Sequence, residues 1–180
     1  MQQKTILDHH QFEITIKRLC FQLIENHHPF NNTVLIGIQP RGVLLCNRIV
    51  ETLHSLNIEN IQSGVLDITF YRDDFRLKSK PMIADETDIK FSLEGRNIIL
   101  IDDVLYTGRT IRAALDAMLD YGRPADVELL VLVDRRLQRH LPIQAKYVGK
   151  VIDSIKAEKV IVEWKETDGT DKVLITAEKD

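Results

Sequence analysis

The stretch Asn97-Ile-Ile-Leu-Ile-Asp-Asp-Val-Leu-Tyr-Thr-Gly-Arg-Thr110 is the segment that decides the fold prediction for this chain. Residues 97–101 form a short apolar run typical of a buried strand. Asp102 and Asp103 follow directly, and a turn that contains Gly108 comes next. The segment therefore predicts a strand with an acidic end, a turn, and then the N-terminus of a helix.

The turn at residues 106–110 is suited to binding a phosphate group. A helix N-terminus presents unpaired N–H groups and a partial positive charge, which favour an anion. Thr107 and Thr110 add hydroxyl donors, and Gly108 allows a ligand to approach the backbone closely. The two carboxylates are suited to ribose hydroxyls or a metal shell, and they would stabilise positive charge that develops on a ribose.

Each half of this segment also has an ordinary structural interpretation. Aspartates are common at strand ends, and Thr-Gly pairs are common at helix starts. The chain has neither a Gly-x-x-x-x-Gly-Lys-Ser/Thr loop nor a Gly-x-Gly-x-x-Gly turn. A receiver-type phosphoacceptor domain would explain acids at strand ends, but it would leave residues 107–110 unexplained. The combination favours a ribose-phosphate site.

The same alternation of strand and helix extends outward from this segment. Apolar runs at residues 33–38 and 127–133 predict two more buried strands, and a helix is expected from Gly42 to about Leu56. The apolar stripe of the first helix has Asp8 near its start. This alternation predicts an α/β fold with a central, mostly parallel sheet flanked by helices, and ligands at the carboxyl ends of its strands.

The remaining segments predict smaller features. Residues 65–71 are expected to form a strand, and the polar, aperiodic residues 72–95 a lid loop. Two strand-like runs at residues 160–164 and 172–176 flank Asp168-Gly169, a pair typical of hairpin turns, so a small C-terminal β element is expected.

Length and composition indicate one soluble domain over residues 1–180. Hydrophobic residues make up 44% and charged residues 28%, and the net charge of −3 does not favour nucleic acid. No apolar run is long enough to cross a membrane, and no signal-peptide core follows Met1. Cys20 and Cys46 lack metal-ligand spacing, and the histidine pairs also lack it, so we expect a reduced, cytoplasmic protein.

In the segment at residues 97–110 and in several other segments, the chain resembles the bifunctional pyrimidine operon attenuation regulator/uracil phosphoribosyltransferase family. Members of this family are type I phosphoribosyltransferases. The segment at residues 99–110 is similar to their signature for 5-phosphoribosyl-1-pyrophosphate (PRPP). The likeness covers nearly the whole chain and extends to residues 67–74, 122–124, 131–135, 141–142, 147–150 and 158–160.

The resemblance implies the transfer of a phosphoribosyl group from PRPP to uracil, which gives UMP and pyrophosphate. Asp102 and Asp103 would order the ribose and contact Mg²⁺ mainly through substrate and water. The resemblance implies that the 5′-phosphate is held by Val104, Leu105, Tyr106, Thr107, Gly108, Arg109 and Thr110.

The turn at residues 39–42 is expected to bind pyrophosphate, because the family places its pyrophosphate loop there. Pro40, Arg41 and Gly42 would form this loop, with Arg41 also in a catalytic role and Arg72 contributing from the lid. Pro40 stands where the family has threonine, and loops of this type often contain a cis peptide. Since a cis bond is least costly before proline, we predict that Gln39–Pro40 is cis.

Val133, Asp134 and Arg135 are expected beside the base, by the same resemblance. Arg136 replaces the glycine that is usual in the family, and the segment that follows is one residue longer. A phosphoribosyltransferase for hypoxanthine or guanine is a rival interpretation. For the assembly of the protein, the resemblance implies a homodimer or a dimer of dimers.

The family's second role is to bind pyrimidine-operon leader RNA. Lys17, Arg18, Lys150 and Lys156 are candidate contacts here, but Phe21 stands where relatives have a polar or basic residue. Because RNA affinity depends strongly on phosphate neutralisation, the loss of cations should weaken binding. The alternative to an active enzyme is an RNA-binding regulator that senses UMP or PRPP with little turnover.

Overall fold

The computed structural model describes residues 3–73, 86–154 and 158–177. Its centre is a five-stranded sheet in the order β3-β2-β4-β5-β6, and every neighbouring pair of strands is parallel. The predicted α/β class is thereby confirmed. The strands are β2 (Thr33–Ile38), β3 (Gln62–Leu66), β4 (Asn97–Leu105), β5 (Asp126–Arg135) and β6 (Tyr147–Ile152).

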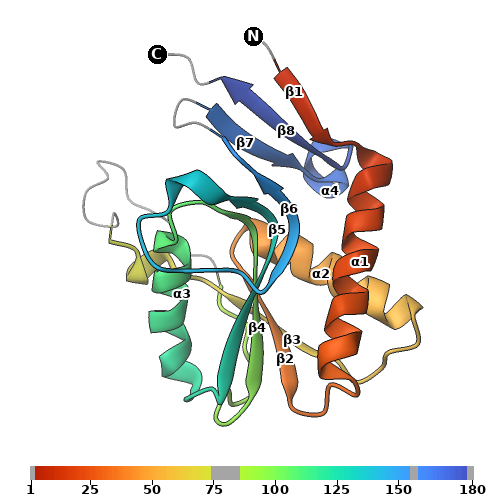
Figure 1. Cartoon of the computed structure of the whole chain (residues 1–180). Coiled ribbons are helices and arrows are strands. Elements are labelled where there is room, and N and C mark those ends of the chain that lie inside the picture. The colour runs from red at the N-terminus through yellow and green to blue at the C-terminus, as the bar shows by residue number, and fades with distance from the viewer. Residues whose placement is uncertain (1–2, 74–85, 155–157, 178–180) are drawn as a thin grey trace.

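Helices cover both faces of this sheet (Figure 1). α1 (His9–His27) and α2 (Arg41–Ser55) pack on one face, and α3 (Arg109–Met118) packs on the other. Two apolar cores result. The central strands β2, β4 and β5 are apolar on both sides because alternate residues contribute to opposite cores.

Local sequence explains where the first helix begins. The side chain of Asp8 accepts a hydrogen bond from the backbone N–H of Gln11, and the Gln11 side chain accepts one from the backbone N–H of Asp8. This reciprocal pair satisfies donors that a helix N-terminus leaves unpaired. Leu19, Cys20 and Leu23 then face the core, so the predicted apolar stripe is confirmed.

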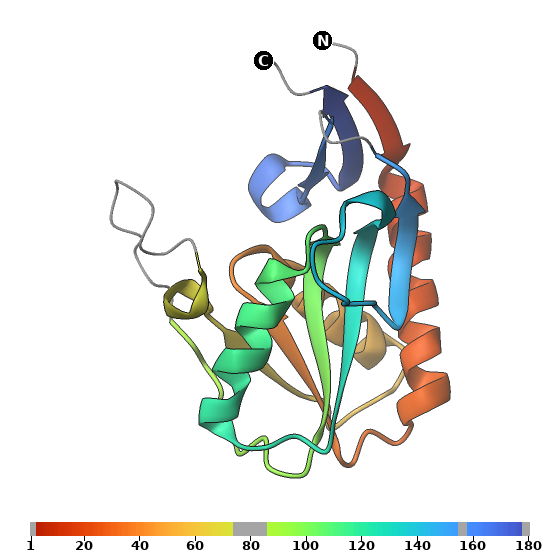
Figure 2. The same ribbon diagram turned by 60° about the vertical axis from the view of Figure 1, so that its left-hand side comes forward.

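A second, antiparallel sheet lies beyond the carboxyl ends of the parallel strands (Figure 2). We call it the hood. Its order is β1-β8-β7, with β1 (Gln3–Leu7), β7 (Glu158–Glu163) and β8 (Lys172–Ala177). The C-terminal strands were predicted, but the N-terminal strand that completes the sheet was not.

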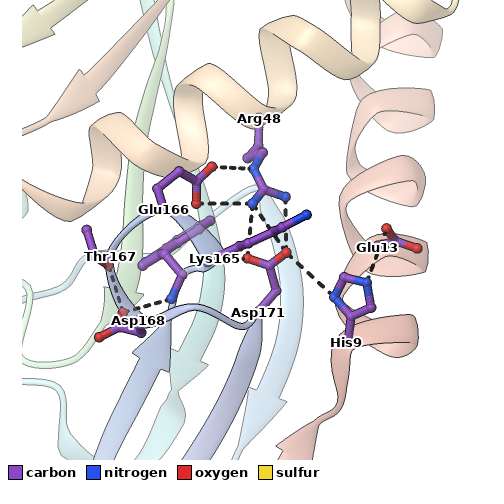
Figure 3. Close-up of polar contacts among 9 residues, drawn as sticks. His9, Glu13, Arg48, Lys165, Glu166, Thr167, Asp168 and Asp171 are labelled. Atoms are coloured by element: carbon purple, nitrogen blue, oxygen red, sulfur yellow. Dashed lines mark hydrogen bonds and ion pairs between the residues drawn. The ribbon is translucent and has the colours of Figure 1, made fainter.

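Arg48 of α2 anchors the hood to the core (Figure 3). Its guanidinium group donates to Glu166 at 2.7 Å and to Asp171 at 3.0 Å. The Asp171 side chain is 1% exposed and also accepts a hydrogen bond from the backbone N–H of Lys165. The buried charge of Asp171 is therefore well compensated, and the hood is held over one end of the sheet.

Two local predictions are wrong. The strand expected at residues 65–71 begins earlier and ends at Leu66, because Asp67 accepts hydrogen bonds from Thr69 and turns the chain into the short 3-10 helix Thr69–Tyr71. β7 and β8 do form an antiparallel hairpin, but the two-residue turn expected at residues 168–169 is instead the end of a one-turn helix, α4 (Lys165–Asp168), capped by Gly169 at φ 78°.

The second part of the predicted lid is anchored to the sheet. Asp88 exchanges backbone hydrogen bonds of 3.0 and 2.9 Å with Val65 of β3, and Leu93 is fully buried. The predicted lid is thus limited to residues 72–85, of which residues 74–85 lie outside the described part of the chain.

Candidate active site

The acidic pair lies inside β4 rather than at its end, since the strand continues to Leu105. Asp102 is 8% exposed and Asp103 9%, and the backbone N–H of Asp103 donates to Asp102 Oδ1 at 2.9 Å. Among the described residues neither carboxylate forms an ion pair. Buried carboxylates without an ion-pair partner have oxygen atoms that can bind the hydroxyls of a ligand or a hydrated cation.

Electrostatics set this pair apart from ordinary surface acids. Burial and then the neighbouring Asp103 raise the pKa of Asp102 well above its usual range. Burial also raises the pKa of Asp103, although the Arg41 charge opposes this shift. The site therefore concentrates negative charge that the fold itself does not fully compensate.

The turn at residues 106–110, which was predicted to bind a phosphate, follows β4 and leads into α3. Gly108 is the N-cap of α3 with φ 91°, a left-handed conformation that side chains rarely adopt. The first backbone bond of the helix runs from the N–H of Arg112 to the carbonyl of Gly108, so the amides before it point out of the helix end without backbone partners in the helix. This geometry confirms the predicted helix N-terminus.

A cavity of about 410 Å³ joins the turn to Asp102, the first residue of the acidic pair. It is enclosed by Asp102, by the whole turn and by the base of the lid. The complete lining is Arg72, Asp73, Asp102, Val104, Leu105, Tyr106, Thr107, Gly108, Arg109, Thr110 and Ile111. A sugar phosphate placed there would have carboxylates at one end and helix amides at the other.

The base of the lid is tied to α3. Asp73 accepts a hydrogen bond from Arg109 at 2.5 Å and lies 4.0 Å from Arg112, which also donates to the carbonyl of Tyr71. Arg72 therefore enters the cavity wall from a segment that α3 holds in place.

The predicted pyrophosphate loop lies beside the acidic pair. The Gln39–Pro40 peptide is cis, as predicted. A Cβ atom on Gly42 would lie 2.3 Å from the carbonyl oxygen of Ile101, so only glycine allows α2 to start this close to β4. Arg41 donates to the carbonyl of Val162 in the hood at 2.5 Å.

The three residues expected beside the base lie next to the acidic pair but differ in their roles. The register pairs Val104 with Val133 and Leu105 with Asp134. The Val133 side chain is fully buried in the core, so only its backbone can face a ligand. The Asp134 side chain is 13% exposed, so it stays the candidate base contact among the three.

Arg135 is occupied elsewhere. Its guanidinium group lies 4.0 Å from the centroid of the Tyr106 ring, and it donates to Ser154 at 2.8 Å and to the carbonyl of Glu158 in the hood at 2.8 Å. Arg136, which replaces the usual glycine, pairs with Asp153 at 2.7 Å. Arg135 therefore supports Tyr106 and the hood.

Arg139 is a site residue that the sequence did not single out for this role. It donates to Asp134 Oδ1 at 2.5 Å and to the carbonyl of Tyr106. Its partners become visible only when two strand ends are brought together, so no local sequence pattern reveals this role.

The other predictions concern groups outside this site. In the described part of the chain no cluster of three or more His, Cys, Asp or Glu side chains could hold a metal ion by itself. Cys20 and Cys46 are buried in the core as predicted, and burial raises the pKa of each thiol to about 12. No helix in the described residues is long and apolar enough to cross a membrane.

The candidate RNA residues that the structure describes have different surroundings. Lys17 lines a groove with Arg48 and Glu51, whereas Arg18 donates to the carbonyls of Val148 and Gly149 in β6. Ile14 and Phe21 are more than half exposed on the same helix. Lys150 is exposed, and Lys156 lies outside the described residues.

Comparisons with known proteins define the class. The phosphoribosyl transferase domain family matches residues 2–167. A hypoxanthine phosphoribosyltransferase structure from Trypanosoma cruzi superposes with a TM-score of 0.73 at 18% identity, covering 98% of this chain and 97% of that one. One from Staphylococcus aureus gives 0.70 at 19% identity, covering 97% and 92%. At these identities the structural likeness establishes the type I phosphoribosyltransferase fold alone.

Curated relatives narrow the assignment. A protein named bifunctional protein PyrR from Enterococcus faecalis is 44% identical over 98% of both chains. Proteins of the same name are 45% identical in Desulfosudis oleivorans, over 97% of both chains, and 44% identical in Actinobacillus pleuropneumoniae, over 99% of both. The chain belongs to this bifunctional PyrR family of phosphoribosyltransferases, and the predicted resemblance is thereby confirmed.

Proposed function

We propose that this protein is a uracil phosphoribosyltransferase, which converts uracil and PRPP to UMP and pyrophosphate. One observation carries the proposal. Asp102 of the buried acidic pair and the left-handed turn at the start of α3 line a single cavity of about 410 Å³, and Asp103 is adjacent in the chain. The two ends of this cavity match the hydroxyls and the phosphate of one ribose 5-phosphate.

Each part of the cavity has a proposed task. Amides and hydroxyls of the turn bind the 5′-phosphate, and Asp102 and Asp103 accept hydrogen bonds from the 2′- and 3′-hydroxyls. As the bond from ribose C1 to pyrophosphate breaks and the bond to uracil N1 forms, these carboxylates stabilise the positive charge on the ribose. Uracil loses its N1 proton in this exchange. We assign the binding of the departing pyrophosphate to Arg41, the amide of Gly42 and Arg72.

The donor set also fits magnesium. Mg²⁺ prefers oxygen ligands, keeps several waters and usually binds through one or two carboxylates together with substrate phosphates. The adjacent side chains of Asp102 and Asp103 supply such oxygens without forming a complete cage. When bound with PRPP, the ion would neutralise charge on the pyrophosphate.

Uracil as the base is supported by the relatives and by two segments. The PyrR relatives align over nearly the whole chain, whereas the hypoxanthine enzymes share only the fold. Residues 67–74 and 131–135 resemble the uracil-using family. Asp134 leaves one carboxylate oxygen available to accept a hydrogen bond from a ring N–H of the base.

RNA binding is the second candidate function, and the word bifunctional in the relatives' names favours it. Because Arg18 already donates to β6 and Ile14 and Phe21 lie exposed nearby, we expect weak binding that falls steeply with salt. Titration of a pyrimidine-operon leader RNA at two salt concentrations, with and without UMP, tests this role. Independently of RNA binding, we propose that the protein assembles as a homodimer or a dimer of dimers, which sedimentation measures.

A panel of bases tests the enzyme function. The full chain is incubated with PRPP, Mg²⁺ and either uracil, hypoxanthine, guanine or orotate, and the nucleotide product is identified. We expect nucleotide from uracil alone. Turnover with a purine and none with uracil would replace the proposed base, and PRPP binding without turnover would favour a nucleotide-sensing regulator.

A further inference from the structure

We propose that Arg139 is a positioning residue for base recognition, which holds the Asp134 carboxylate in place and links it to the phosphate turn. This inference rests on the proposed function. Arg139 contacts Asp134, the candidate base contact, and Tyr106, the first residue of the phosphate turn, and it does not line the cavity itself.

The first step is the state of Asp134. Its side chain is only 13% exposed, and in the described part of the chain Arg139 alone forms a hydrogen bond or ion pair with it, through Oδ1. A carboxylate has two oxygens, so Oδ2 can accept an N–H from a ligand. Uracil presents two ring N–H groups. Fixing Oδ1 therefore fixes the direction in which Oδ2 points.

The second step is the position of Arg139 between the two subsites. The guanidinium group also donates to the carbonyl of Tyr106, the residue at which the phosphate turn begins. The next two residues, His140 and Leu141, donate backbone hydrogen bonds to the carbonyl of Thr107 at 3.0 and 3.2 Å. Residues 139–141 are thus docked on the turn, and Arg139 spans from there to Asp134.

The neighbouring arginines show that this arrangement is specific to one position. Arg135 is committed to Tyr106, Ser154 and the hood, and Arg136 pairs with Asp153 at the surface. The planar guanidinium group of Arg139 donates to two acceptors at once, which a lysine ammonium group cannot match with the same geometry. The short 3-10 helix Arg136–Gln138 places Arg139 back over the strand end.

The consequence is a selective effect on the base. With Arg139→Gln, the Asp134 carboxylate is no longer held, and the KM for uracil should rise roughly 10- to 100-fold, the range expected for one charge-assisted hydrogen bond. The kcat should change much less, because Asp102 and Asp103 are untouched. Arg139→Lys should recover part of the loss. A purely structural defect would instead lower kcat and thermal stability together.

The test is a double-mutant cycle. Rates of UMP formation are measured for wild type, Arg139→Gln, Asp134→Asn and the double variant, with Arg136→Gln as the matched control arginine. If Arg139 acts through Asp134, the double variant is no worse than Asp134→Asn alone, and Arg136→Gln resembles wild type.

Two outcomes separate the claims. An active wild type with an unchanged uracil KM in Arg139→Gln, or strictly additive effects in the cycle, overturns the role of Arg139 and leaves the proposed function intact. A wild type that forms no UMP overturns the proposed function, and this inference falls with it.

Discussion

An acidic pair and a single glutamate lie on neighbouring strands of the same sheet, and their surroundings are opposite. Asp102 and Asp103 on β4 are buried without an ion-pair partner among the described residues, and burial raises the pKa of both. Glu128 on β5 is also largely buried, but Lys146, Tyr147 and His27 all bind it.

We infer from this contrast that Glu128 serves the fold and that the acidic pair serves a ligand. Burial alone would raise the pKa of Glu128, but the hydrogen bonds from Lys146, Tyr147 and His27 together lower it. Glu128 therefore stabilises the folded chain as a charged group. The acidic pair costs stability when it is charged, and such a cost is typical of residues kept for function.

Replacing the acidic pair should produce the largest effect. With Asp102→Asn/Asp103→Asn, the rate of UMP formation should fall by about 1,000-fold or more, because two groups that stabilise the developing ribose charge are lost. The free energy of unfolding should stay the same or increase, since two buried charges are removed. Initial rates and denaturant unfolding measure both quantities. A large loss of stability would show that the pair is structural.

Closing the phosphate turn to ligands should come next. Gly108→Val forces a branched side chain into φ 91° and places its Cβ atom 3.3 Å from Ile143. Strain of about 1–3 kcal/mol at the turn should raise the KM for PRPP by roughly 10- to 100-fold. Gly169→Val is the matched control, because Gly169 has φ 78° in open space far along the chain. Equal effects of the two variants on PRPP would contradict the assigned turn.

Neutralising Glu128 should have the opposite effects to replacing the acidic pair: stability should fall and activity should be retained. Glu128→Gln removes the charge that Lys146 and His27 bind, so the free energy of unfolding should fall by about 1–3 kcal/mol. The values of kcat and KM should remain near those of wild type. Urea unfolding and steady-state kinetics test this pairing. A strong loss of activity in a stable variant would place Glu128 in the site instead.

Lowering the pH should reveal the stabilising role of Glu128 through a smaller change in the free energy of unfolding. The folded-state pKa of Glu128 is lowered, so its contribution is present above its unfolded pKa of about 4.3 and is lost as pH falls through the folded value. Glu166 behaves alike, since Arg48 lowers its pKa. Between pH 7 and pH 3.5 wild type should lose more stability than Glu128→Gln. Parallel curves would contradict the role given to Glu128.

The sequence predicted the site best where the site is local. Asp102, Asp103 and the turn are contiguous, so strand, helix and phosphate chemistry could be recognised within one segment. Arg139 acts through a carboxylate and a carbonyl on two different strand ends, and no local pattern reveals that contact.

The same distinction explains the fold. The central strands are continuous apolar runs and were predicted well. β6 was missed because Gly149 and Lys150 interrupt its apolar pattern, and β1 because its five residues become a strand only by pairing with β8, from the opposite end of the chain. Contacts between distant segments decided the elements that local patterns could not.

Amide hydrogen exchange with and without PRPP and Mg²⁺ tests the central claim most directly. The amides at the start of α3 have no helical partners, so PRPP should slow exchange over residues 106–112 and leave residues near Glu128 unchanged. Protection concentrated around β5 and α1 near Glu128, or no protection at the start of α3, would show that the phosphate site has been assigned to the wrong part of the molecule.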